Sequence, residues 1–132
     1  MIVLCLNCRG LGETQAVKDL RALVRRFSPR LVFLSETKRS KLEMEAMLVQ
    51  LGDYYGFFVD ARGRSGGLAL LWDKHLALTV LSHSFHHINT TLQWHTHDPV
   101  WRFTGVYGWP ENEHKHRTGE MIADLKTHMD LP

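Results

Sequence analysis

Residues 1–12 read MIVLCLNCRGLG, and residues 31–38 read LVFLSETK. Each stretch begins with a short apolar run, and the polar residues Asn7 and Glu36 follow the two runs closely. The residues between them carry apolar side chains at the spacing of an amphipathic helix, which Pro29 is predicted to end. The pattern therefore predicts a strand–helix–strand unit, in which the ends of neighbouring strands lie side by side.

The two polar residues at these strand ends suggest a metal site. A carboxamide and a carboxylate are hard oxygen ligands that suit Mg²⁺, and open α/β sheets bind ligands at the carboxyl ends of their strands. Taken singly, Asn7 is an ordinary turn residue and Glu36 an ordinary surface acid. Both interpretations stay open at this stage.

The rest of the chain changes from a helical to a strand-rich pattern. Ser40 and Glu43 have the spacing of a capping box at the start of a second helix, which Gly52 is predicted to end. Apolar runs bounded by turn residues predict strands at residues 54–59, 68–72, 76–81, 88–94 and 100–107. Short connections favour antiparallel pairing, and a further helix is predicted from Pro110. The predicted fold class is α/β, with mixed, mostly antiparallel strands and flanking helices.

Composition limits the class of protein. A chain of 132 residues predicts one domain, and a formal net charge of +2 does not by itself indicate a polyanionic partner. The basic residues are nevertheless bunched, either as a solvated helix face, which is the favoured interpretation, or as a rim facing phosphate groups. They are Arg21, Arg25, Arg26, Arg30, Lys38, Arg39 and Lys41.

The cysteines and the apolar runs indicate the compartment. Cys5 and Cys8 form a lone C-x-x-C, which we interpret as a pair of reduced structural thiols rather than a zinc or redox site. The amino terminus does not have the pattern of a signal peptide, and no apolar run reaches membrane-spanning length. We expect a nuclear or cytoplasmic protein that does not bind a membrane.

Other residues are candidates for phosphate contacts. Gly66 and Gly67 precede an apolar strand, which indicates either a close backbone approach or a plain hairpin start. Arg62 and Arg64 flank them, and guanidinium groups suit phosphate oxygens. Tyr107 ends the last predicted strand, where it either donates a hydrogen bond to a phosphate or packs as an aromatic side chain.

Nine histidines raise the hypothesis of a metal site. Most lie between residues 83 and 116, but no carboxylate or cysteine completes a tight constellation in the sequence. We favour surface and turn histidines over metal ligands.

Residues 6–12 (LNCRGLG), 32–38 (VFLSETK), 62–72 (RGRSGGLALLW) and 103–108 (FTGVYG) form an ordered series of motifs. This series resembles the endonuclease/exonuclease/phosphatase superfamily. It is most similar to the apurinic-type endonuclease domain of plant non-LTR (LINE-type) retrotransposons. The resemblance implies a two-sheet α/β sandwich, a divalent-metal site that uses Mg²⁺ or Mn²⁺, and phosphodiester cleavage by an activated water.

The resemblance also implies roles for individual residues. Asn7 would help hold the site and the attacking oxygen, Glu36 would bind Mg²⁺, and Tyr107 would contact the scissile phosphate. Arg9, with Arg62 and Arg64, is a candidate for substrate binding. The implied partners are DNA and a reverse transcriptase domain in the same polyprotein.

The sequence departs from the pattern of that family in two respects. Leu6 occupies the place of a tryptophan, which should have little effect because it remains apolar. More seriously, the later Gly-Asp-Phe-Asn and Ser-Asp-His types of motif do not occur, so residues 1–132 resemble a single partial domain that lacks its carboxy-terminal half.

Three hypotheses follow from these departures. The first is a truncated Mg²⁺-dependent endonuclease of retroelement origin, inactive as this chain because the general base is missing. The second is a non-catalytic remnant that binds nucleic acid weakly. The third is a phosphoesterase of the same fold that acts on a small molecule.

Overall fold

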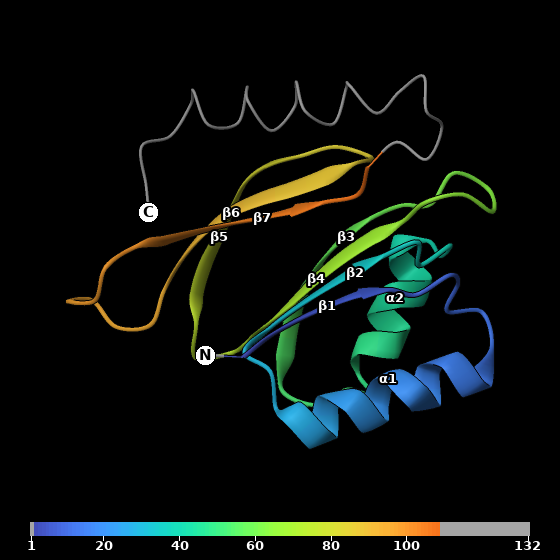
Figure 1. Ribbon diagram of the computed structural model, residues 1–132, viewed down its shortest axis with the longest axis horizontal. Helices are drawn as coiled ribbons and strands as arrows, with labels where there is room; N and C mark the ends of the chain where they lie inside the picture. The colour runs from blue at the N-terminus through green and yellow to red at the C-terminus, as the bar shows by residue number, and fades with distance from the viewer. Residues whose placement is uncertain (1, 109–132) are drawn as a thin grey trace. The chain divides into compact units, whose positions relative to one another are not determined.

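A four-stranded sheet with two helices forms the first of two units in the computed structural model, which describes residues 2–108. The elements run β1 (Val3–Asn7), α1 (Thr14–Phe27), β2 (Leu31–Ser35), α2 (Lys41–Leu48), β3 (Tyr54–Val59) and β4 (Leu68–Asp73). The sheet has the order β1-β2-β4-β3 (Figure 1). β1 pairs with β2 in parallel and the other pairs are antiparallel, which confirms the predicted strand–helix–strand unit.

The core of this unit lies between the sheet and the two helices. Leu20 and Val24 of α1 pack in one cluster with Met44 and Met47 of α2. The sheet contributes to the same cluster through alternate residues of its central strands, namely Val32, Leu34, Ala69 and Leu71. Because alternate residues of a strand share one face, both helices cover the same face of the sheet (Figure 1).

The helix ends follow the predicted signals in part. Ser28 caps α1 in a left-handed conformation just before Pro29, and the capping box of α2 is present, with Ser40 and Glu43 each accepting a hydrogen bond from the other's backbone. α2 ends at Leu48, however, and does not continue to Gly52. The next residues form tight turns, in which Leu51 N donates to Leu48 O over 3.0 Å. This tightening keeps Leu51 buried, so the apolar spacing continues beyond the regular helix.

The second unit begins at Ala77 and contains an antiparallel three-stranded sheet. Its strands are β5 (Ala77–His83), β6 (His87–Gln93) and β7 (Trp101–Val106), in the order β5-β6-β7. All the predicted strands within residues 2–108 are present with small shifts at their ends, and the α/β class with mostly antiparallel strands is confirmed. The helix predicted from Pro110 lies outside the described residues.

Within residues 2–108, neither helix has the length and the apolar character needed to cross a membrane.

Candidate functional site

Three chain segments meet where β1 and β2 end and β4 begins. We call residues 7–11, 36–38 and 66–67 the strand-end junction. Gly10 N donates to Glu36 O over 2.8 Å, and Leu11 N donates to Thr37 O over 2.9 Å. On the other side, Thr37 N donates to Gly67 O over 3.2 Å. Backbone pairing thus continues past the regular strands and fixes the segment 36–38 from both sides.

The parallel register brings Asn7 close to Glu36 in the backbone. Asn7 lies opposite Ser35, the residue immediately before Glu36. The side-chain oxygen of Asn7 accepts a hydrogen bond from Arg9 N over 3.2 Å, which orients the carboxamide. The structure therefore brings Asn7, Arg9 and Glu36 to one edge of the sheet, and Arg62 and Arg64 lie in the exposed turn that directly precedes Gly66 and Gly67 of the junction.

Non-glycine residues with left-handed backbone are concentrated in this junction. The φ angles are 51° at Arg9, 52° at Glu36 and 56° at Lys38. For an L-residue this conformation costs roughly 1–2 kcal/mol, and it persists where the surroundings over-determine it, as they often do at functional sites. The backbone hydrogen bonds on both sides of residues 36–38 provide that constraint.

The thiol of Cys8 is sensitive to the charge of Glu36. Burial, and then the carboxylate of Glu36, raises the pKa of Cys8 to about 12. Burial also raises the pKa of Cys5. Because the thiolate is the form that reacts and binds metals, these shifts keep both cysteines unreactive near neutral pH.

Tyr107 follows β7 in the second unit, where His86 holds its backbone and ring. Tyr107 N donates to His86 O over 2.7 Å, and His86 Nδ1 donates to Tyr107 O over 2.9 Å. The two rings are nearly parallel, 9° apart, with their centroids 5.9 Å from each other. Sequence reasoning missed this partner of Tyr107, because the pairing depends on how the turn before β6 meets the end of β7.

His87 corrects the expectation of surface histidines. It is buried in β6, with Nδ1 at 2.6 Å from Ser84 Oγ and Nε2 at 3.2 Å from Ser82 Oγ. Burial, and then the charges of His83 and His86, lowers the pKa of His87. His95 and His97, in contrast, are exposed in a turn, as predicted. The local sequence does not distinguish the two cases.

The lowered pKa of His87 predicts a loss of stability in acid. As the pH falls below 6.5, the ordinary pKa of histidine, His87 gains a proton in the unfolded chain more readily than in the folded chain. The free energy of unfolding should therefore fall as the pH falls. Urea unfolding at about pH 7.5 and about pH 5.5 would measure this, and His87→Gln should reduce the difference. His97→Gln, at an exposed turn position, is the control. An equal acid response in wild type and His87→Gln would contradict the prediction.

The basic residues of the chain differ in their surroundings. Arg25 and Arg26 are exposed in the last turn of α1, as the interpretation of a solvated helix face predicts. Arg30 pairs instead with Asp73 over 3.1 Å. Arg9, Arg62 and Arg64 are exposed, and Arg62 forms a tight turn with Ser65 through two backbone hydrogen bonds.

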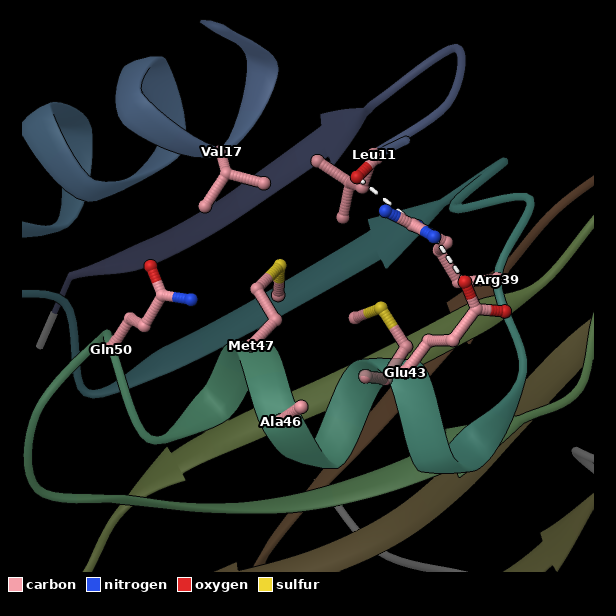
Figure 2. Close-up of a pocket in the computed structure, with 8 residues that line it drawn as sticks. Leu11, Val17, Arg39, Glu43, Ala46, Met47 and Gln50 are labelled. Carbon is pink, nitrogen blue, oxygen red and sulfur yellow. Dashed lines mark hydrogen bonds and ion pairs between the residues drawn. The ribbon is translucent and has the colours of Figure 1, made fainter. Parts of the chain in front are cut away.

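A cavity of about 290 Å³ lies between α1 and α2, and Figure 2 shows its lining. Arg39 Nε donates to Leu11 O over 3.2 Å, and its guanidinium also pairs with Glu43. Val17 of α1 lies across the cavity from Met47 of α2 (Figure 2). Arg39 therefore ties the segment after β1 to α2, which is a structural role.

The sequence profile of the Endonuclease/Exonuclease/phosphatase family matches residues 4–128. The chain belongs to this family. None of the curated proteins matches the chain. Solved structures do resemble it, and at the identities given below they show the fold alone.

The endonuclease domain of TRAS1, a telomere-specific non-LTR retrotransposon, has a TM-score of 0.71 and 14% identity, covering 97% of this chain and 53% of that one. The 3′ phosphatase NExo from Neisseria has a TM-score of 0.66 and 15% identity, covering 95% and 52%. The catalytic domain of APE2 from Xenopus laevis has a TM-score of 0.64 and 17% identity, covering 96% and 52%.

The chain spans about half the length of these solved structures. The two sheets and their helices are thus part of the α/β sandwich of the Endonuclease/Exonuclease/phosphatase family, which confirms the fold that the resemblance implied. The likeness to an amino-terminal portion of the domain is also confirmed.

Enzymes of this family generally depend on a divalent metal, and the strand-end junction is where oxygen ligands for Mg²⁺ would lie. Residues 2–108 contain no group of three or more histidine, cysteine, aspartate or glutamate side chains able to hold a metal ion. The junction offers the carboxylate of Glu36 and the carboxamide of Asn7, which the backbone register of β1 and β2 brings to neighbouring segments. Mg²⁺ is commonly held by one or two carboxylates and keeps several waters. The donor set therefore fits part of a magnesium site.

Proposed function

We propose that the chain is part of an Mg²⁺-dependent endonuclease domain of retroelement origin, which cleaves phosphodiester bonds in DNA. The observation that carries this proposal is the meeting of Asn7 and Glu36 at adjacent strand ends in a chain of the Endonuclease/Exonuclease/phosphatase family. The likeness in fold to the endonuclease domain of a non-LTR retrotransposon supports the retroelement origin.

Asn7 and Glu36 would hold the Mg²⁺ ion, and Mn²⁺ would suit the same oxygen ligands. When bound, the ion would offset negative charge on the phosphate. The hydrogen bond that Arg9 N donates to the side-chain oxygen of Asn7 fixes the orientation of the Asn7 carboxamide in the junction. Glu36 is held by backbone bonds on both sides of its segment, so its carboxylate needs little rearrangement before it binds.

Tyr107 would donate a hydrogen bond from its phenol to an oxygen of the scissile phosphate. His86 restricts the Tyr107 backbone and ring, so less freedom remains to be lost when DNA binds. Arg9, Arg62 and Arg64 are exposed cations that would contact the DNA backbone.

We infer that this chain does not complete the cleavage step by itself. A general base must lie within hydrogen-bond reach of the attacking water, and the sequence lacks the late motifs that would supply it. Asp73 and His75 do form a pair, with the ring nitrogen 2.9 Å from the carboxylate. That pair lies at the end of β4 opposite to the junction, because Asp73 is the last residue of the strand, about five residues or roughly 17 Å from Leu68.

The complete protein would include the missing portion of the domain and a reverse transcriptase in the same polyprotein, and it would act in the nucleus or cytoplasm. A reading frame that continues past Pro132 with the late motifs would support this view. An immediate stop would favour a non-catalytic remnant.

Nicking of supercoiled plasmid DNA in Mg²⁺ tests the proposal directly. We expect negligible nicking by the 132-residue chain, and nicking that requires Glu36 in any longer product that carries the late motifs. Glu36→Ala is the matched variant for both. Equal nicking with and without Glu36 would remove this residue from the mechanism, and rapid Glu36-dependent nicking by the short chain would contradict its incompleteness.

A further inference from the structure

Gly67 lies in contact with Thr37 at the centre of the strand-end junction. Its φ angle is +92°, which L side chains rarely adopt. A Cβ at this position would overlap the hydroxyl of Thr37 and would lie 3.1 Å from Lys38 N. Both the conformation and the space around residue 67 therefore require glycine.

Thr37 connects the two sides of the junction. Its backbone N donates to Gly67 O, and its backbone O accepts from Leu11 N. The side chain is fully buried, and among the described residues its hydroxyl has no hydrogen-bond partner. Burying a hydroxyl without a hydrogen-bond partner is unfavourable. Because this hydroxyl makes no such bond among the described residues, hydrogen bonding does not explain why Thr37 packs closely on Gly67.

We propose that Gly67 and Thr37 are positioning residues for Glu36, an inference that rests on the proposed metal-binding role of Glu36. Glu36 immediately precedes Thr37 and holds a left-handed φ of 52°. Its own carbonyl accepts from Gly10 N over 2.8 Å. A displacement of Thr37 away from residue 67 therefore moves the backbone of Glu36 and strains its bond to Gly10. The absence of a side chain at residue 67 keeps the carboxylate in place.

Gly67→Ala tests this coupling, and Gly12→Ala is its control, because a Cβ at residue 12 would meet no atom within 4 Å. Hydrogen–deuterium exchange followed by mass spectrometry would report on the backbone bonds of the junction. Gly67→Ala should speed exchange at least about tenfold at the junction amides while the central strands stay protected. Those amides belong to Gly10, Leu11, Thr37 and Lys38.

Mn²⁺ binding, followed by the loss of the electron paramagnetic resonance signal of the free ion, reports on Glu36 itself. Gly67→Ala should weaken Mn²⁺ binding about 10–100-fold, the range seen when groups that orient metal ligands are removed. Gly12→Ala should retain wild-type affinity. The double variant Gly67→Ala with Thr37→Ala removes the overlapping hydroxyl, so it should recover part of the protection and of the affinity.

The outcomes separate this inference from the proposed function. Wild-type affinity and protection in Gly67→Ala would overturn the positioning role. Should Gly67→Ala fail to fold, the double variant decides, and no recovery on removal of the Thr37 hydroxyl would overturn the role as well. If Mn²⁺ binding by the wild-type chain does not depend on Glu36, the proposed function is overturned first, whatever the exchange experiment shows.

Discussion

Replacing Leu71 with alanine should destabilise the first unit by about 2–5 kcal/mol, as truncation of a buried leucine does in other proteins. Leu71 lies in β4 between Val32 of β2 and Gly56 of β3, and its side chain is 0% exposed within the cluster that joins the sheet to both helices. Small domains are stable by only about 5–15 kcal/mol. The loss is therefore a large fraction of the total.

Urea unfolding followed by circular dichroism would measure this change as a shift of the midpoint at unchanged slope. Leu42→Ala is the matched control, because Leu42 is 78% exposed on α2 and its truncation should change stability by less than about 0.5 kcal/mol. Similar shifts for Leu71→Ala and Leu42→Ala would show that the helix-covered face is not the principal core.

Glu36→Gln should weaken Mn²⁺ binding at least about tenfold while leaving the fold intact. The change keeps the shape of the side chain and removes its charge, and a divalent ion held by one carboxylate loses most of its attraction without that charge. The left-handed backbone at residue 36 remains, since it depends on the hydrogen bonds around it. Circular dichroism would check the fold, and the resonance signal of free Mn²⁺ would give the affinity.

Glu45→Gln provides the comparison for this substitution, because Glu45 is an exposed acid on α2 outside the junction. It removes the same charge from the chain, so it controls for any general attraction of cations. Equal affinity in the two variants would mean that Mn²⁺ binds the protein diffusely and that Glu36 is not a ligand.

Much of the fold was predictable because hydrophobic periodicity and turn signals are local properties of the sequence. The unit from β1 to β2 and the capping box at Ser40 both appear where expected. The end of α2 was not predictable, because Leu51 stays buried through the tight turns that follow the helix, as it would in a longer helix. Local spacing alone does not distinguish those two forms.

The candidate site was predictable only at the level of strand ends. The parallel topology places Asn7 next to the residue before Glu36, as the sequence pattern indicated. The contact of Gly67 with Thr37, and that of His86 with Tyr107, depend on how segments far apart in sequence meet. The sequence raised close backbone approach at Gly67 as one interpretation, without its partner, and it did not identify His87 as buried.

The left-handed backbone at Glu36 has a consequence for the evolution and engineering of this chain. Glycine adopts such a conformation without the steric penalty that an L side chain incurs. Substitutions selected only for thermal robustness would therefore favour glycine at this position, which would delete the acid on which the proposed chemistry depends. Durability and catalytic potential are opposed at this residue, as at many sites where function retains an unfavourable geometry.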